Sequence, residues 1–161
     1  MKQDFPIFLR KINGKSLVYL DNAATTQKPA CVIDAMSQFY SLSNANVHRA
    51  VHTLAGEATE GYEACRTLLK ERYNANRAII TSGTTEAINL VARSWGEYNL
   101  NSGDVVVLTE MEHHSDIVPW QMLAERKAIE LRYIPVIDGE LDLDAFDVAL
   151  EGAKLVCVVH T

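Results

Sequence analysis

The stretch DVVVLTEMEHHSDIVPWQMLAERKAIELRYIPV, residues 104–136, decides the fold that the sequence predicts. It opens with an apolar, β-branched run at 104–110, continues with helical spacing over 117–128 and closes with a second apolar run at 130–136. Short apolar runs that alternate with a helix are typical of β–α–β units, whose parallel strands are buried on both faces. We therefore expect two parallel strands joined by a right-handed crossover helix.

The same alternation continues on both sides of this stretch. A strand at 77–81 and a helix at 84–98 precede it, and a helix at 143–152 with a strand at 154–160 follows it. Asp142 stands where it can cap the third helix. Three successive β–α–β steps predict an α/β fold with a mostly parallel sheet, which binds ligands at the carboxyl ends of its strands.

The N-terminal part of the chain is less regular. A turn at Asn13-Gly14 leads into a predicted short strand at 16–20 and then into a loop of small and polar residues. Pro29 suits the start of a helix, and a long helix is expected over 53–74.

Composition excludes several classes of protein. The chain has 161 residues, 48% of them hydrophobic and 22% charged, as expected of one globular domain. A net charge of −6 with scattered Lys and Arg argues against nucleic-acid binding, and no apolar run reaches the roughly 18–20 residues that span a bilayer. Three separated cysteines without a CxxC motif favour a reducing, cytoplasmic location.

The segment TSGTTE, residues 81–86, is a candidate phosphate site at a strand end. Gly83 would allow a tight turn and close backbone approach, and the first amides and the dipole of the following helix favour an anion. Thr84 and Thr85 add hydroxyl donors. The alternative is ordinary capping by Ser or Thr with no ligand. Neither a GxxxxGK[ST] nor a GxGxxG motif is present.

The segment EMEHHSD, residues 110–116, carries two adjacent histidines at the end of the next strand. Neighbouring residues on a strand point to opposite sides, so a metal held by both His113 and His114 is disfavoured. One imidazole could instead stack on a planar ligand or transfer protons, and a purely structural role is the alternative.

A second pair, His48 and His52 in HRAVH, would share one helical face and could bind a metal if this segment were helical. The glutamate of HExxH is missing and the preceding residues read as a loop, so a structural role or ligand contact is favoured. Arg49 has a guanidinium fork that suits a carboxylate.

Five segments together resemble the N-terminal part of the cysteine desulfurases of the class V aminotransferase family, the branch related to selenocysteine lyases. They are YLDNAATTQKP, NANVHRAVHTLAGEATEGYEACR, TSGTTEAINLVARSWG, GDVVVLTEMEHHSDIVPWQMLA and VVHT, in this order. The resemblance implies the large domain of a fold-type I enzyme that uses pyridoxal 5'-phosphate and forms homodimers. It also implies removal of sulfur from L-cysteine, or selenium from selenocysteine, leaving alanine. A persulfide would then pass to an acceptor protein of iron–sulfur cluster assembly.

The resemblance also implies roles for individual residues. His113 would lie against the pyridine ring and assist proton transfer, and His114 would be its outward neighbour. The phosphate cup would be formed by Gly83, Thr84 and Thr85. The substrate entrance would be lined by Ala23, Ala24, His48 and Arg49.

By the same resemblance, residues 1–45 form an N-terminal arm with the first helix, and residues 46–161 form a partial cofactor-binding large domain. The lysine that holds the cofactor, the aspartate that pairs with the pyridine nitrogen and the cysteine that carries the persulfide would all follow Thr161. We therefore expect an incomplete sheet, a strand at 77–81 without its usual neighbours, and no activity from this piece alone. A truncated reading frame or a piece of a longer enzyme explains such a chain.

Three alternatives remain open at this level. The parent enzyme could be a selenocysteine lyase or another class V aminotransferase-like enzyme. The chain could be a catalytically dead fragment that dimerises with a full-length protomer. It could also be a metal-binding domain that uses His48, His52, His113 and His114.

Overall fold

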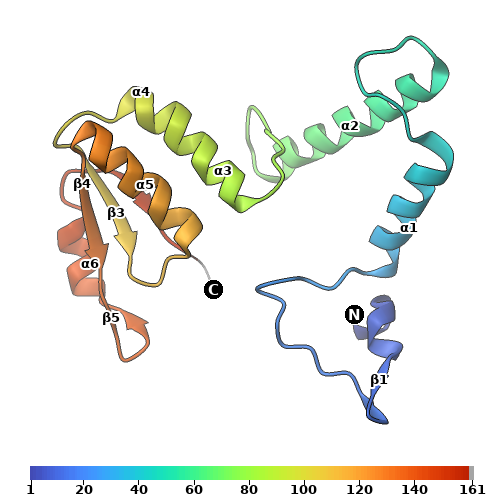
Figure 1. Ribbon diagram of the computed structural model, residues 1–161, viewed down its shortest axis with the longest axis horizontal. Helices are drawn as coiled ribbons and strands as arrows, with labels where there is room; N and C mark the ends of the chain where they lie inside the picture. Colours follow the sequence, from blue (N-terminus) through green and yellow to red (C-terminus); the bar gives the residue numbers. More distant parts are fainter. Residues whose placement is uncertain (160–161) are drawn as a thin grey trace. The chain divides into compact units, whose positions relative to one another are not determined.

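The computed structural model describes residues 1–159. The chain divides into two compact units, Met1–Ile79 and a second unit that begins at Ile80. Each unit has its own elements, and the second one holds the sheet (Figure 1).

The sheet of the second unit has three parallel strands. Strand β3, Val105–Thr109, lies between β4, Glu130–Ile134, and β7, Ala153–Cys157. The ladder with β4 runs from Val105 to Thr109, and the ladder with β7 runs from Val105 to Leu108, with one irregularity between Val105 and Val106. The predicted parallel sheet is therefore confirmed, with β3 at its centre.

Both faces of β3 are buried, and alternate residues belong to different clusters. Val106 and Leu108 pack in one core cluster with Trp120 and Leu123. On the opposite face, Val105 and Val107 form a second cluster, which also contains Ile134 and Ala149. This burial on both sides explains why the strand reads as a continuous apolar run.

Two long helical segments cover the first face. One is α3, Thr84–Val91, which continues without interruption through the π-helical η4, Ala92–Gly96, and the short α4, Glu97–Asn99. The other is α5, His114–Lys127. Both predicted helices are confirmed.

The second face is covered by α6, Leu143–Ala149, which packs near β4. Asp142 caps this helix as predicted: its Oδ1 accepts hydrogen bonds from the amides of Asp144 and Ala145 at 3.1 and 3.0 Å.

The predicted strand at 130–136 is wrong in its extent. β4 ends at Ile134, and Pro135, which has no N–H, separates it from a small antiparallel hairpin. This hairpin consists of β5, Val136–Ile137, and β6, Glu140–Leu141. The predicted strand at 154–160 is shorter too, because β7 ends at Cys157; His160 lies outside the described residues.

The first unit is mostly helical. The turn at Asn13-Gly14, the helix after Pro29 and the long helix are confirmed. Its elements are η1 (Lys2–Asp4), η2 (Pro6–Leu9), β1 (Lys11–Ile12), β2 (Lys15–Ser16), α1 (Ala30–Gln38), η3 (Phe39–Ser43) and α2 (Thr53–Arg72).

Two strand predictions are wrong, at 16–20 and at 77–81. Only Ser16 of the first belongs to a strand, and residues 77–81 belong to none. An apolar run becomes a strand only when another strand pairs with its backbone groups, and in the described part of the chain no partner pairs with residues 17–20 or 77–81. Leu20 and Ile79 are consequently 90% and 73% exposed.

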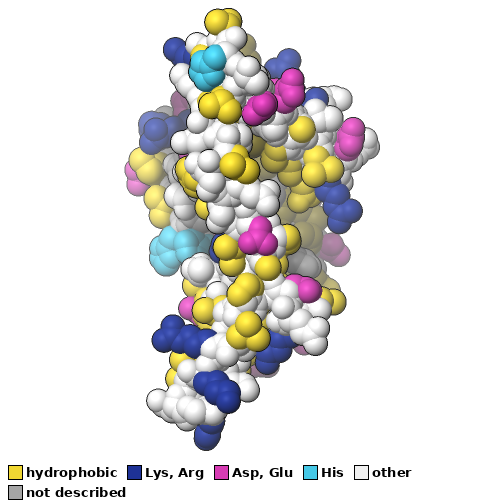
Figure 2. All heavy atoms as spheres, turned by 90° about the vertical axis from the view of Figure 1, so that its right-hand side faces the viewer, with side chains coloured by type: hydrophobic (Ala, Val, Ile, Leu, Met, Phe, Trp, Pro, Cys, Tyr) yellow, Lys and Arg dark blue, Asp and Glu magenta, His cyan; other side chains and the backbone are white. Residues whose placement is uncertain are grey.

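Apolar side chains also reach the surface elsewhere in the first unit, as the space-filling view shows (Figure 2). Met36, Tyr40 and Leu42 are examples on α1 and η3. In contrast, no helix within residues 1–159 is both long enough and apolar enough to span a bilayer.

Candidate active site at the carboxyl edge of the sheet

Helix α3 begins at an open N-terminus. Its N-cap is Gly83, whose φ of 166° and ψ of 177° describe extended backbone that any residue can adopt. The expected reason for glycine, a tight turn, is therefore wrong. The space beside Gly83 is open, because a Cβ built at this position would have no atom within 4 Å.

The ordinary capping alternative does not hold for α3 either, because no side chain accepts a hydrogen bond at its cap. Ser82 instead donates from its amide and its hydroxyl to Oε2 of Glu86, at 2.7 and 2.6 Å. These two hydrogen bonds, the hydroxyl one first, lower the pKa of Glu86 below its ordinary value. Thr84 and Thr85 stay exposed, and the first amides of a helix have no partner within the helix.

His113 lies at the N-terminus of a helix and not at the end of a strand, so the premise of our alternation argument is wrong. β3 ends at Thr109, and His113 is the N-cap of α5. Its Nδ1 accepts a hydrogen bond from the amide of Ser115 at 3.1 Å and lies 2.8 Å from that residue's Oγ. Because an amide can only donate, Nδ1 is the acceptor, and the proton of the neutral imidazole sits on Nε2.

His114 is the first residue of α5, and both histidines are exposed. The two rings meet edge-on, with centroids 6.3 Å apart and an interplanar angle of 89°. They are therefore neighbours with perpendicular planes.

The starts of α3 and α5 lie at the same edge of the sheet. The two helices run in the same direction, because Ala87 shares a hollow with Asp116 near their starts and Arg126 binds Glu97 near their ends. Both pack on the β3 face that carries Val106 and Leu108. Since α5 starts after the carboxyl end of β3, the starts of both helices lie at that edge, on one face of the sheet (Figure 1). These starts are residues 83–85 for α3 and His113 for α5.

An apolar hollow of about 230 Å³ lies beneath these two helix starts. It is lined by Ala87, Ile88, Val91, Asp116, Trp120, Leu155 and Cys157. Burial, followed by the negative charge of Asp116, raises the pKa of Cys157 to about 12. The thiol is therefore un-ionised at neutral pH and unsuited to nucleophilic attack.

The residues predicted at a substrate entrance belong to the first unit. Ala23, Ala24 and Arg49 are exposed in loops. His48 has a left-handed φ of 64°, its amide donates to Oγ1 of Thr59 at 3.1 Å, and its Nε2 lies 3.1 Å from Oε1 of Glu63. Their role at an entrance stays a prediction.

His48 and His52 do not share a helix, as chelation of one metal would require. His52 caps α2, where its Nδ1 accepts a hydrogen bond from the amide of Ala55 at 3.3 Å, while His48 precedes the helix in a loop. Among residues 1–159, no three His, Cys, Asp or Glu side chains form a group that could hold a metal.

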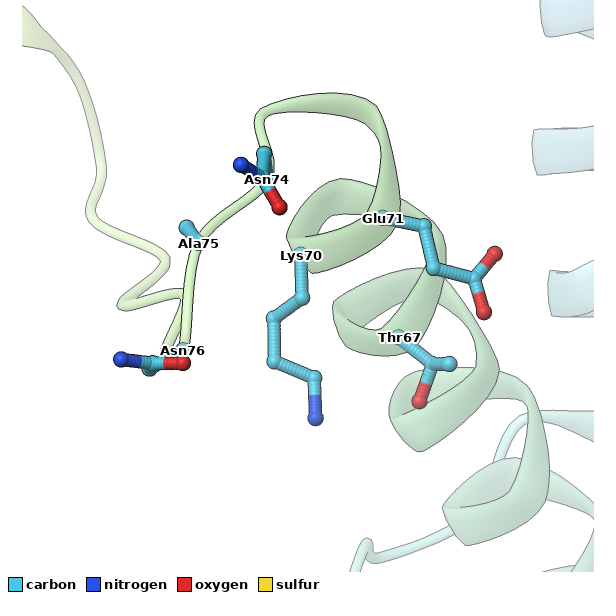
Figure 3. Close-up of a pocket in the computed structure, with 6 residues that line it drawn as sticks. All are labelled: Thr67, Lys70, Glu71, Asn74, Ala75 and Asn76. Carbon is cyan, nitrogen blue, oxygen red and sulfur yellow. The ribbon is translucent and has the colours of Figure 1, made fainter.

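The first unit also has an open hollow of about 400 Å³ at the C-terminal end of α2 (Figure 3). It exists because Asn74 takes a left-handed φ of 48° and turns the chain back, so that the amide of Ala75 reaches the carbonyl of Lys70 at 2.8 Å. The side chains of Lys70 and Glu71 point in different directions. This hollow contains none of the predicted site residues.

Comparison with known proteins identifies the family of this chain. Residues 18–161 match the sequence model of the family described as Aminotransferase class-V. The chain belongs to this family. A cysteine desulfurase of Synechococcus elongatus is 49% identical over 150 residues, which cover 91% of this chain and 24% of that protein. A probable cysteine desulfurase of Staphylococcus epidermidis is 47% identical over 163 residues, which cover 98% of this chain and 40% of that protein.

A solved structure shows the same fold. The apo cysteine desulfurase from Thermococcus onnurineus NA1 superimposes with a TM-score of 0.84 at 38% identity, over 98% of this chain and 38% of that one. The fold is therefore that of a pyridoxal-phosphate-dependent cysteine desulfurase, with a partial sheet. The chain spans 24% and 40% of the length of the two curated relatives named above.

As a class V aminotransferase homologue, the chain has features that fit the phosphate and the ring of the family's cofactor. The amides at the start of α3 are open to an anion, and the space around Gly83 is free. His113 offers a flat ring at the same edge of the sheet. An exposed threonine pair and an imidazole are suitable partners for a phosphorylated aromatic molecule.

Two residues at this edge were missed by sequence reasoning. Glu112 is only 7% exposed and Thr109 is fully buried, and Thr109 Oγ1 donates to Glu112 Oε1 at 2.7 Å. The available signal was an acidic residue directly before His113 and three positions after Thr109, a spacing at which a turn can bring two side chains together.

Proposed function

We propose that this chain is the cofactor-binding N-terminal part of a cysteine desulfurase that uses pyridoxal 5'-phosphate. The whole enzyme would take sulfur from L-cysteine, leave L-alanine and carry the sulfur as an enzyme persulfide to iron–sulfur cluster assembly. The observation that carries this proposal is the common position of the starts of α3 and α5 at the carboxyl edge of β3. Family membership supplies the chemical class.

In this proposal the start of α3 holds the phosphate. The amides of Thr84 and Thr85 would donate hydrogen bonds to the phosphate oxygens, and the helix dipole would favour the negative charge. The Glu86 carboxylate accepts from the amide and the hydroxyl of Ser82 and not from the amides of Thr84 and Thr85, so these hydrogen bonds leave both amides for an anion.

His113 would be the flat partner of the cofactor ring, and the cofactor supplies an electron sink for the substrate's bonding electrons when it is bound. The hydrogen bond from the Ser115 amide engages Nδ1, so Nε2 is the nitrogen that can donate a proton or a hydrogen bond. The same bond restricts rotation of the ring. His113 would therefore orient the ring and hold a proton at Nε2.

The remaining assignments rest on resemblance to the family. Arg49 and His48, with Ala23 and Ala24, would lie near the substrate entrance, where a guanidinium suits the carboxylate of L-cysteine. Residues from about 46 onward would belong to the large domain. We also propose a homodimer of the whole enzyme in the cytoplasm and an acceptor protein for its sulfur.

The site can be tested with a ligand that cannot react with lysines. Pyridoxine 5'-phosphate has the ring and the phosphate but no aldehyde, so its binding reports recognition alone. In a titration of the ¹⁵N-labelled chain, we expect it to shift the amide signals of residues 83–85 and of His113 together. Pyridoxine, which lacks the phosphate, should bind weaker by about tenfold or more, as the loss of charge-assisted hydrogen bonds implies.

Variants refine this test. Thr85→Val should weaken binding of pyridoxine 5'-phosphate, whereas Thr67→Val, at an exposed threonine of α2, should not. Signal shifts at only one of the two helix starts, or equal binding of pyridoxine, would contradict the proposed site.

The activity needs a whole enzyme. The matching 40% of the staphylococcal relative can be replaced by this chain, and the chimera assayed for L-alanine formed from L-cysteine. We expect activity that depends on His113 and Thr85. A folded, dimeric chimera that binds pyridoxal phosphate but makes no alanine would argue against the desulfurase assignment.

A further inference from the structure

Glu112 joins the ends of two strands at the edge where His113 lies. One carboxylate oxygen, Oε1, accepts two hydrogen bonds of 2.7 Å, from Oγ1 of Thr109 and from the backbone amide of Val159. Thr109 is the last residue of β3, and Val159 lies two residues beyond the end of β7. The side chain therefore links β3 to β7 beyond their last paired residues, Leu108 and Cys157.

This contact is buried. Glu112 is 7% exposed and Thr109 is 0% exposed. A buried carboxyl group needs hydrogen bonds to offset the loss of water, and a bond inside the protein is stronger than one at the surface. Such a pair of bonds should restrain both segments.

The same contact closes the turn that leads to His113. The amide of Glu112 donates to the carbonyl of Thr109 at 3.4 Å, and the side chains of the two residues bind each other over the same four-residue turn. His113 follows directly as the N-cap of α5. The direction in which this N-cap leaves the sheet is thus set by the closed turn.

Glu110 provides a matched comparison on the other side of β3. Its Oε2 accepts a hydrogen bond from the amide of Val136 at 3.2 Å, the first amide after Pro135. Glu110 is exposed, and it is the second residue of the turn from Thr109 to Glu112, but its side chain binds Val136 and not Thr109 or Val159. It links β3 to the segment after β4 without holding the start of α5.

We propose that Glu112 is a positioning residue: its carboxyl group fixes the turn that presents His113 and the chain that leaves β7 at Val159. This rests on the proposed role of His113 as a partner of the cofactor ring. The position of the acceptor oxygen matters more for this restraint than its charge, because both donors, the Thr109 hydroxyl and the Val159 amide, are neutral. Glutamine should therefore replace Glu112, since its carbonyl oxygen can accept the same two hydrogen bonds.

The test uses the 161-residue chain without cofactor and two NMR readouts. The first is hydrogen exchange of the Val159 amide, and the second is the pair of imidazole ¹⁵N shifts of His113, which report whether Nε2 carries the proton. Glu112→Ala should speed exchange at Val159 by about tenfold, the change expected from losing one hydrogen bond of ordinary strength. It should also replace the single Nε2–H form of His113 by a mixture of tautomers.

The controls separate positioning from general stability. Glu112→Gln should keep both signals, and Glu110→Ala should affect exchange at Val136 but leave Val159 and His113 unchanged. If Glu112→Ala fails to fold, Thr109→Val is the decisive variant, because it removes one hydrogen-bond donor with little change in shape. It should give a mixture of His113 tautomers, while hydrogen exchange at the Val159 amide stays slow.

The proposal is overturned if His113 keeps a single tautomer in Thr109→Val and Glu112→Ala, or if Glu110→Ala has the same effect as Glu112→Ala. Neither readout needs a bound cofactor. Failure of pyridoxine 5'-phosphate to bind would therefore contradict the proposed function without affecting the role of Glu112 in positioning His113. Failure of the Glu112 test would likewise leave the proposed function unaffected.

Discussion

The indole Nε1 of Trp120 donates a hydrogen bond to Oδ1 of Asp116, at 3.0 Å and one helical turn earlier on α5. The pair holds a carboxylate at the wall of an apolar hollow, next to the thiol of Cys157. Burial comes first among the causes that raise the pKa of Cys157 to about 12, and the charge of Asp116 comes second.

The first prediction concerns thiol reactivity. At pH 8 Cys157 should react with iodoacetamide far more slowly than Cys31 and Cys65, which are both exposed. Asp116→Asn removes the negative charge and should speed labelling of Cys157, while Asp34→Asn on α1 should not. Mass spectrometry of labelled peptides measures all three rates. Equal rates at Cys157 in the wild type and in Asp116→Asn would contradict the role given to Asp116.

The second prediction is the pH dependence that follows from the same thiol. Its pKa is raised from 9.0 to about 12, so the folded state retains the proton more strongly than the unfolded state. The stability linked to Cys157 is therefore fully present below pH 9 and is lost as the pH rises toward 12. Urea unfolding at several alkaline pH values should show this loss, and it should disappear in Cys157→Ala.

The third prediction concerns the contact between the two parallel helices. A Cβ at Gly96 would lie 3.0 Å from Cδ2 of Leu123 and 3.2 Å from Trp120. Gly96→Ala should thus lower the free energy of unfolding by about 1–3 kcal/mol, as overpacking does. Gly61→Ala in α2 meets no atom within 4 Å and should raise helix stability by about 0.5–1 kcal/mol. Denaturant melts compare the two, and a stable Gly96→Ala variant would refute the tight contact.

The fourth prediction concerns the start of α3. Ser82 lowers the pKa of Glu86, so this interaction stabilises the fold above the ordinary pKa of a glutamate and is lost as the pH falls through the lowered value. Ser82→Ala should return the pKa of Glu86 toward 4.5. The carboxyl ¹³C shift of Glu86, followed from pH 2 to pH 7, measures this change. Ser102→Ala, on the loop before β3, is the control and should leave that titration unchanged.

Part of this architecture followed from local patterns. Asp142 and the apolar spacing after it predicted α6, because a capping side chain needs only amides two or three residues away. β3 was predicted from a continuous apolar run, which indicates burial on both faces. α5 was predicted from helical spacing of apolar residues, which indicates burial on one face. In each case the predictive pattern lies within a short stretch of sequence.

The run at 77–81 shows where such reasoning fails. Its apolar, β-branched residues fit a strand, but a strand needs a partner far away in the sequence, and none pairs with it among residues 1–159. His113 shows a second limit. The turn from Thr109 to Glu112 takes the histidine off the strand and onto a helix N-terminus, so alternation along a strand no longer applies.

The sequence alone determined the class of fold, the order of β3, α5, β4, α6 and β7, the family resemblance and the candidate residues at 83–85 and 113, because these depend on neighbours within a few positions. Only the tertiary structure showed that both helix starts lie at one edge of the sheet, that Ser115 engages Nδ1 of His113, and that Glu112 reaches Val159. The last contact joins residues that are 47 positions apart, and only the parallel pairing of β3 with β7 brings them together.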